Sequence, residues 1–236
     1  GDLGQQLREE PDHPVPPGDL LADDFALGQT DGGGAQRHAM CESELDVLRS
    51  AGRPALARSL NVALIGNFPP RRCGIATFTR DLHQALQGAD AKLVSHVVAM
   101  NDGKESYKYP KDVQFDIRQD DIADYLEAAN RINASGADVV CVQHEYGIFG
   151  GPAGANLLLL LDRLRIPVVS TLHTVLAAPN EDQRAVLTRL IARSSKVVVM
   201  AEKARALLLE VYDAPARKIV VIPHGAPDHP LADTQP

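Results

Sequence analysis

The sequence has 236 residues, a formal net charge of −7 and 44% hydrophobic residues, which suits one large α/β domain or two small ones. Aromatic residues make up only 4% and Trp is absent, so stacking platforms for single-stranded nucleic acid or carbohydrate are scarce. The charge is uneven, because residues 1–58 carry 11 acidic and 5 basic side chains. The remaining residues are nearly neutral, which argues against a nucleic-acid footprint.

The cysteines indicate a reducing compartment. Cys41, Cys73 and Cys141 are an odd number and form no C-x-x-C pair, so we expect free thiols and a cytoplasmic protein. No run approaches the ~18 apolar residues that span a bilayer, and no signal peptide opens the chain. The chain begins with Gly1 rather than Met, so we expect a fragment.

Residues 1–40 are rich in Gly, Pro, Asp and Gln and show no apolar period. This composition predicts a disordered acidic tail, and a mobile arm that docks on a partner is the alternative. Residues 41–58 predict a short helix and a linker. Ser43 is the candidate N-cap of that helix and Gly52 its stop signal.

From residue 59 to residue 226, short β-branched runs alternate with amphipathic stretches. The expected strands are Val62–Ile65, Leu93–Ala99, Val113–Phe115, Val139–Gln143, Val168–Leu172, Val197–Met200 and Ile219–Ile222. The expected helices are Ile75–Gln87, Asp120–Ala134, Ala153–Leu164, Glu181–Ser194 and Glu202–Tyr212. Continuously apolar strands are typical of a parallel sheet with both faces covered. The pattern predicts an α/β, Rossmann-like, doubly wound and mainly parallel sheet.

Ligands of such sheets bind beyond the carboxyl ends of the strands. Three predicted strands end at histidines, "HEYGIFGG" at His144, "HT" at His173 and "PHG" at His224. Since these ends meet at one edge of the sheet, we expect the three histidines to converge on one site. Taken alone, His173 is also compatible with a capping or core histidine.

The first strand ends at "GNFPPRRCGIATFTRDL", which begins at Gly66. This stretch has neither the G-x-x-x-x-G-K-[ST] pattern of a P-loop nor the G-x-G-x-x-G pattern of a nicotinamide site. It does place Gly74 directly before a predicted helix, where a backbone without Cβ lets a ligand approach closely.

The helix start in that stretch is a candidate anion site. We expect the N–H groups of Ile75, Ala76 and Thr77 to face an anion, with help from the helix dipole. Arg71 and Arg72 are placed to add positive charge. The alternative is an ordinary strand-to-helix turn with solvated arginines.

Two other constellations are weaker. A metal site would use imidazole and carboxylate ligands, namely His144, Glu145, His173 and His224, but these lack the short local spacing of zinc motifs. We therefore expect no metal. Glu202 and Glu210 share a helix face, which in this charged context indicates a solvated surface rather than a catalytic pair.

Five segments in order now carry a resemblance. They read "NVALIGNFPPRRCGIATFTRDLHQAL", "DVVCVQHEYGIFGG", "IPVVSTLHT", a strand–helix pair and "KIVVIPHGAPD". Residues 61–226 thereby resemble the amino-terminal domain of family 4 (group 1) glycosyltransferases, which have the GT-B fold. The resemblance implies that residues 59–226 form the acceptor-side Rossmann-like domain and that residues 227–236 begin a truncated interdomain linker.

The resemblance also implies roles. The Gly74 loop would lie against the donor phosphates and sugar, His144 and Glu145 would border the acceptor pocket, and His173 would contact the transferring sugar as the catalytic residue. It implies no cofactor, because the nucleotide-sugar donor is a substrate. It also implies no protein nucleophile, because these retaining enzymes show no clear one. The expected substrate-binding residues are Asn67, Arg71, Arg72, Gly74, Ile75, Thr77, His144, Glu145, Thr174, His224 and Gly225.

The chain departs from the family pattern in two places. Cys73 stands where the family often has a first glycine, and the last turn reads Pro223-His224-Gly225 instead of Pro-Asn-Gly. The family's donor-binding glutamates belong to a second domain, which we expect to be missing from this chain.

The expected function is therefore carbohydrate biosynthesis by a retaining hexosyltransferase of which this chain is the acceptor-side half. Its expected partners are the nucleotide-sugar donor, a glycan, lipid-linked or small-molecule acceptor, and the missing carboxy-terminal domain. Membrane contact stays open, since no basic amphipathic face stands out. The alternatives are a non-catalytic glycan- or nucleotide-binding module from a truncated transferase and another α/β enzyme, such as an epimerase or hydrolase. The sequence lacks the G-x-S-x-G nucleophile elbow that an α/β hydrolase would need.

Overall fold

The computed structural model describes residues 43–51, 59–103 and 107–225. The predicted tail at 1–40, the stop at Gly52 and the linker at 227–236 lie outside these residues. Residues 43–51 form a helix that begins at Ser43, the predicted N-cap.

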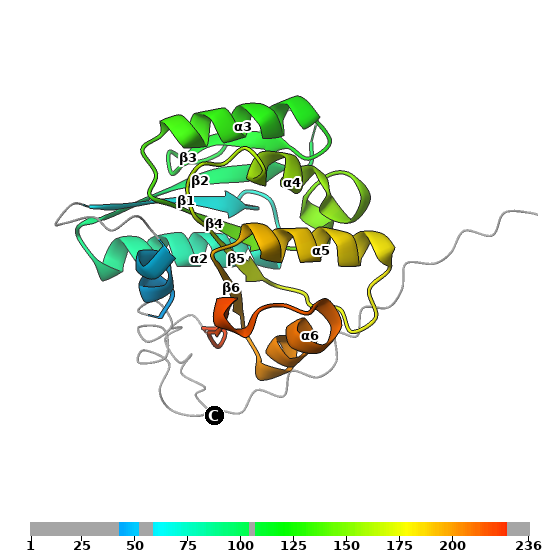
Figure 1. Ribbon diagram of the computed structural model, residues 1–236. Coiled ribbons are helices and arrows are strands. Elements are labelled where there is room, and N and C mark those ends of the chain that lie inside the picture. The colour runs from blue at the N-terminus through cyan, green and yellow to red at the C-terminus, as the bar shows by residue number, and fades with distance from the viewer. Residues whose placement is uncertain (1–42, 52–58, 104–106, 226–236) are drawn as a thin grey trace, which may run out of the picture. The chain divides into compact units, whose positions relative to one another are not determined.

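Seven strands and five longer helices alternate along the rest of the described chain (Figure 1). The strands are β1 (Leu60–Gly66), β2 (Leu93–Asn101), β3 (Val113–Arg118), β4 (Val139–His144), β5 (Val168–Leu172), β6 (Lys196–Val199) and β7 (Ile219–Val221). The helices are α2 (Gly74–Ala89), α3 (Ile122–Ala134), α4 (Asn156–Leu161), α5 (Glu181–Arg193) and α6 (Glu202–Tyr212).

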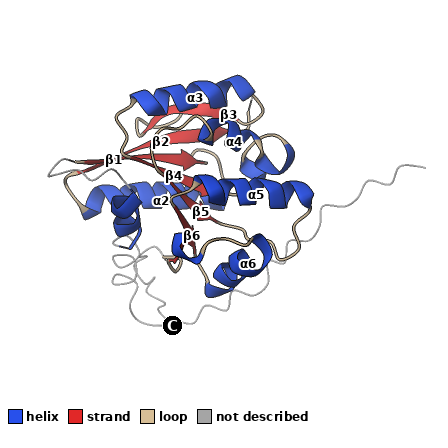
Figure 2. Cartoon of the chain, viewed as in Figure 1, coloured by secondary structure: helices blue, strands red, loops and turns tan. Residues whose placement is uncertain are grey.

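The strands form one sheet in the order β3-β2-β1-β4-β5-β6-β7, and every ladder is parallel (Figure 2). The order reverses between β1 and β4, because β2 and β3 extend the sheet on one side of β1 and β4 to β7 extend it on the other. This reversal is a topological switch point, where ligands of doubly wound sheets bind. The predicted fold class is confirmed.

Two apolar layers cover the two faces of the sheet, because successive strand residues point to opposite sides. On one face, Leu82 and Leu86 of α2 and Leu45 and Leu48 of the 43–51 helix pack against residues such as Leu64. The other face carries α3, α4, α5 and α6, whose contributions include Tyr125, Leu157, Leu187 and Leu208. Burial of both faces explains why the strands read as continuous apolar runs.

One predicted helix is wrong in extent. The sequence predicts Ala153–Leu164, whereas the structure has a short 3₁₀ turn at Pro152–Gly154 and then α4. Ala153 has φ = 51° and Gly154 has φ = +82°, and this left-handed backbone cannot continue a right-handed helix. The leucines of α4 are nearly all buried, as expected for a helix between the sheet and its neighbours.

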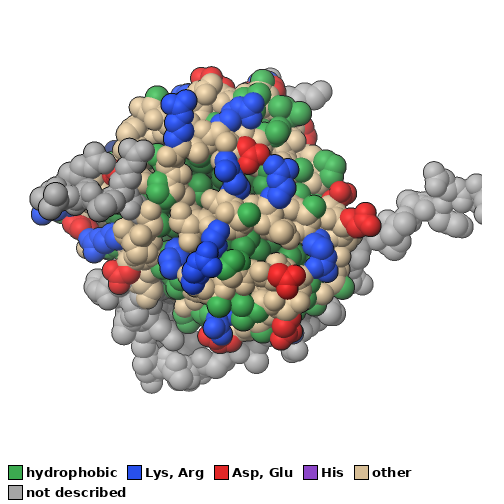
Figure 3. All heavy atoms as spheres, viewed as in Figure 1, with side chains coloured by type: hydrophobic (Ala, Val, Ile, Leu, Met, Phe, Trp, Pro, Cys, Tyr) green, Lys and Arg blue, Asp and Glu red, His purple; other side chains and the backbone are tan. Residues whose placement is uncertain are grey.

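The outer surface of this helical layer is polar and mixed in sign. Lys and Arg side chains are interspersed with acidic and apolar groups across the face shown in Figure 3. Arg189 and Arg193, for example, both contact Asp162, at 2.8 and 3.0 Å. Within the described residues, no helix is long and apolar enough to cross a membrane.

Candidate functional site

The loops after β1 and β4 leave the sheet at its switch point, and the segments after β5 and β7 leave it at the same edge. Phe78, in the first turns of α2, connects these segments. Its ring meets that of His173 edge-on at 4.8 Å between centroids and that of His224 at 5.3 Å. The structure therefore brings the loop after β1 next to two of the three predicted histidines.

Polar contacts brace the loop after β1 from within. Arg71 donates to Asn67 Oδ1 at 2.9 Å and pairs with Asp102 at 3.2 Å, while Asn67 Nδ2 donates to Cys73 Sγ at 3.1 Å. Asn67 is fully buried, whereas Arg72 is exposed. Arg71 thus holds the loop to the end of β2, and Arg72 is the arginine that remains exposed.

Cys73 is the N-cap of α2 and takes up two of the N–H groups expected to face an anion. Its Sγ accepts from the N–H of Ala76 at 3.3 Å, and its carbonyl accepts from Thr77 at 3.2 Å. This leaves the N–H groups of Gly74 and Ile75 for an anion. A Cβ built on Gly74 meets nothing within 4 Å, so the backbone is open to a ligand there.

His173 follows β5 and is oriented by a buried amide. Its Nε2 lies 3.0 Å from Oε1 of Gln143, which is fully buried on β4. Burial, and secondarily the nearby His224, lower the pKa of His173 to about 4. The imidazole is therefore neutral at pH 7.

His144 lies apart from this cluster, although the sequence places it at the same edge. It is fully buried, stacked on Phe149 at 6.0 Å and edge-on to Tyr146 at 5.1 Å between ring centroids. Burial lowers the pKa of His144 to about 3. The alternation of a strand explains the difference, because Gln143 and His144 point to opposite faces of the sheet.

Glu145 joins the ends of β4 and β5. Its Oε2 accepts from the hydroxyl of Thr174 at 2.5 Å, and its Oε1 accepts from the N–H of Tyr146 at 2.9 Å. The backbone N–H of His173 also donates to the carbonyl of His144 at 3.0 Å. Glu145 and Thr174 thus fix the segment that carries His173, and both stay partly exposed at the sheet edge.

His224 is exposed after β7, and its Nδ1 lies 2.7 Å from the carbonyl oxygen of Gly225. Glu202 is solvated and pairs only loosely with Arg205, at 3.6 Å, as its charged helix face predicts. Within the described residues, no group of three His, Cys, Asp or Glu side chains is placed to hold a metal ion.

Sequence reasoning missed Gln143 and Phe78. The sequence predicts Gln143 only as the last residue of a buried strand, and Phe78 only as part of the helix Ile75–Gln87. One signal was available, since Gln143 is a polar side chain on the strand face that α2 covers. A buried amide at a strand end needs partners, and here the partner is His173.

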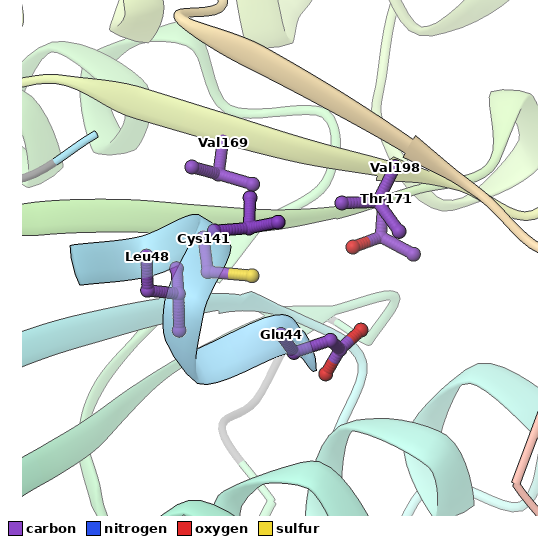
Figure 4. Close-up of a pocket in the computed structure, with 7 residues that line it drawn as sticks. Glu44, Leu48, Cys141, Val169, Thr171 and Val198 are labelled. Carbon is purple, nitrogen blue, oxygen red and sulfur yellow. The ribbon is translucent and has the colours of Figure 1, made fainter. Parts of the chain in front are cut away.

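A separate pocket lies beneath the 43–51 helix rather than at the strand ends (Figure 4). Glu44, Cys141 and Thr171 line it together with apolar side chains, and it has no room for a water molecule. Oε2 of Glu44 has no hydrogen-bond partner among the described residues, and burial raises the pKa of this carboxyl to about 8. Such a closed space suits helix packing rather than substrate binding.

Comparisons with known proteins place the chain in a family. A glycosyltransferase from Rickettsia africae ESF-5, solved by crystallography, shares 17% identity at a TM-score of 0.47, over 71% of this chain and 43% of that one. The chain thus spans less than half the length of that protein, and no curated protein matches it. The model of Glycosyltransferase Family 4 matches residues 72–228, about two-thirds of the sequence, and the chain therefore belongs to that family.

Proposed function

We propose that this chain is the acceptor-side half of a retaining hexosyltransferase that uses a nucleotide-sugar donor. The observation that carries the proposal is the pairing of two complementary groups at the switch point. Gly74 offers open backbone at a helix start, and Phe78, four residues later, packs against the neutral ring of His173. An anion and an uncharged sugar would each find a suited partner there.

The anion in this proposal is the donor pyrophosphate. The N–H groups of Gly74 and Ile75 lie at the positive end of the α2 dipole, which favours negative charge. Arg72, which is exposed two residues before Gly74, adds a cation. These contacts to the pyrophosphate are few, and a second GT-B domain would supply the remaining donor contacts.

His173 acts on the sugar. A neutral imidazole held in one orientation forms a hydrogen bond to a sugar hydroxyl and keeps the sugar aligned as the bond to the leaving phosphate breaks. Glu145 and Thr174 border the acceptor side and keep the loop after β5 in place. His224, whose ring also packs against Phe78, would border the same site.

The test uses the protein encoded by the complete reading frame and a panel of nucleotide-sugars. Release of the nucleotide diphosphate measures turnover, and proton NMR of the product reports the anomeric configuration. We expect transfer with retention for at least one donor. Transfer with inversion would contradict the retaining mechanism, and donor binding without turnover would favour a non-catalytic binding module.

The same assay on the 236-residue chain tests the half-enzyme proposal. We expect this chain to fold and to transfer sugar at no more than background rates. Robust transfer by these residues alone would show that the donor site is already present in them.

A further inference from the structure

Gln143 uses both ends of its amide inside the fold. Its Oε1 lies 3.0 Å from Nε2 of His173, and its Nε2 donates to Sγ of Cys141 at 3.3 Å. The side chain has no exposed surface. Because a buried amide is costly to leave unpaired, these two contacts fix its orientation.

This orientation sets the tautomer of His173. In this orientation of the amide its oxygen faces the ring and accepts, so Nε2 of His173 carries the ring proton. A neutral imidazole has one N–H, which makes Nδ1 a bare acceptor. Nδ1 makes no hydrogen bond to any described residue, so it is available to a ligand.

Gly66, the last residue of β1, has no side chain and so leaves room for the side chain of Gln143. A Cβ at this position would lie 2.9 Å from Cβ of Gln143 and 3.1 Å from Oγ1 of Thr79. Thr79 cannot easily give way, because it is fully buried and its hydroxyl donates to the carbonyl of Ile75 at 2.8 Å. Any side chain at Gly66 would therefore displace Gln143.

We propose that Gln143, seated by Gly66, is a positioning residue that holds His173 as its Nε2–H tautomer and leaves Nδ1 to accept a hydrogen bond from a substrate hydroxyl. The assignment of the hydroxyl to a sugar rests on the function proposed above. A bare Nδ1 has no proton to offer a phosphate oxygen. His173 therefore selects the hydroxyl-bearing part of a substrate, and the anion is left to the helix start at Gly74.

The titratable groups that face His173 come from two elements, the segment after β7 and the end of β4. A positive charge on His173 is disfavoured by His224, and it would in turn lower the pKa of His144. From α2 the neighbour is Phe78, which has no charge. The neutral state and the tautomer of His173 thus have separate causes, burial and Gln143.

The tautomer is tested on the 236-residue chain itself, by long-range ¹H–¹⁵N NMR of ¹⁵N-histidine-labelled protein. His173→Gln identifies the His173 signals by their loss. We expect a protonated Nε2 and a bare Nδ1 in the parent chain, and a mixture of tautomers in Gln143→Leu. A bare Nε2 in the parent chain, or an unchanged tautomer in Gln143→Leu, overturns the proposal.

Two further variants guard against a simple folding defect. Gln143→Glu keeps an acceptor and adds a negative charge, so we expect the Nε2–H tautomer to persist and the pKa of His173 to rise. Gly66→Ala should reproduce the tautomer mixture of Gln143→Leu. Gly88→Ala is its matched control, since a Cβ at Gly88 meets nothing within 4 Å, and it should leave the ring signals unchanged.

Kinetics of the complete enzyme test the substrate role. We expect Gln143→Leu to lower kcat about 10-fold, as for loss of one good hydrogen bond, and Gln143→Glu to retain more activity and to move the acidic limb of the pH profile upward. A predicted tautomer combined with unchanged kcat in Gln143→Leu overturns that role. If the complete protein transfers no sugar, the proposed function fails, while the NMR result on Gln143 stands by itself.

Discussion

His173 and His144 carry the same side chain on neighbouring strands, yet their surroundings give them different roles. His144 is enclosed by Phe149 and Tyr146, so its ring serves packing. His173 is partly exposed at the sheet edge, and within the part of the chain that the structure describes its ring has one hydrogen bond, to Gln143. At the scale of single residues, the environment therefore separates an enclosed histidine from the one that we propose to contact substrate.

Replacement of His173 tests this distinction. In the complete enzyme, we expect His173→Ala to lower kcat by about 100-fold or more, because positioning of the sugar in the transition state is lost. The free energy of unfolding should fall by about 1–3 kcal/mol, since the replacement leaves the buried amide of Gln143 without its partner. Steady-state kinetics and chemical denaturation measure the two effects, and unchanged turnover would remove His173 from the site.

Cys73 explains a departure from the family pattern at the same scale. The family often has a glycine here, and Cys73 instead caps α2 through its sulfur. We expect Cys73→Ala to lower stability by about 1 kcal/mol, while Cys73→Ser, which retains an acceptor, should stay near the parent. Thermal denaturation of both variants checks this, and equal stability of the two would mean that the sulfur cap contributes nothing.

At the scale of elements, the 43–51 helix buries a carboxyl whose charged form is disfavoured. Glu44 lies in a closed pocket with Cys141 and Thr171, and its pKa is raised to about 8 by burial (Figure 4). The native state therefore keeps this proton to higher pH than the unfolded chain does, whose ordinary pKa is 4.5. The contribution of Glu44 to the free energy of unfolding is fully present below pH 4.5 and is lost as the pH rises toward 8.

Glu44→Gln should remove this dependence. Between pH 5 and pH 8, we expect the parent chain to lose up to about 1.4 kcal/mol per pH unit through Glu44, and the variant to lose none from this position. Amide hydrogen exchange of residues 45–48 at several pH values reports on the helix itself. Parallel exchange profiles for the two proteins would show that Glu44 is already ionised in the native state.

The elements were mostly predictable from the sequence, and the failures have specific causes. Strands such as β4 and β5 are buried on both faces, so their apolar runs are unmistakable. The start of α4 was misplaced because left-handed backbone at Ala153 leaves no signal in an apolar pattern. Gln143 was missed because its role depends on a residue 30 positions away, and Cys73 because sulfur is a weak acceptor that propensities do not rank as a cap.

For the whole molecule, buried histidines oppose folding in acid. The pKa values of His83, His96, His144 and His173 are all lowered, in each case chiefly by burial. The native state keeps these rings neutral, while the unfolded chain binds protons as pH falls below 6.5. Each of these four positions should therefore lose stability as pH drops below about 6.5, while Glu44 acts in the opposite direction, so the test is made in the Glu44→Gln background.

Chemical denaturation at pH 7.5 and pH 5.5 measures this loss. We expect a lower midpoint at pH 5.5 with an unchanged dependence on denaturant, since the fold itself stays the same. His96→Leu is a suitable comparison, because His96 is buried and its Nε2 has no hydrogen-bond partner among the residues that the structure describes. This variant should lose less stability between the two pH values, and an identical loss would show that His96 is charged in the native state.

The strand order also has a consequence for how the chain reaches its native state. Five of the six ladders join strands that are consecutive along the chain, whereas β1 and β4 must find each other across 77 residues, where Asn61 N donates to Asp138 at 3.0 Å. The entropy of closing that loop is lost before the ladder compensates for it. During synthesis, β1, β2 and β3 leave the ribosome before β4 has been made. The edge of β1 that pairs with β4 in the finished sheet is therefore unpaired until then. That edge is where a nascent chain would most need shielding from its neighbours.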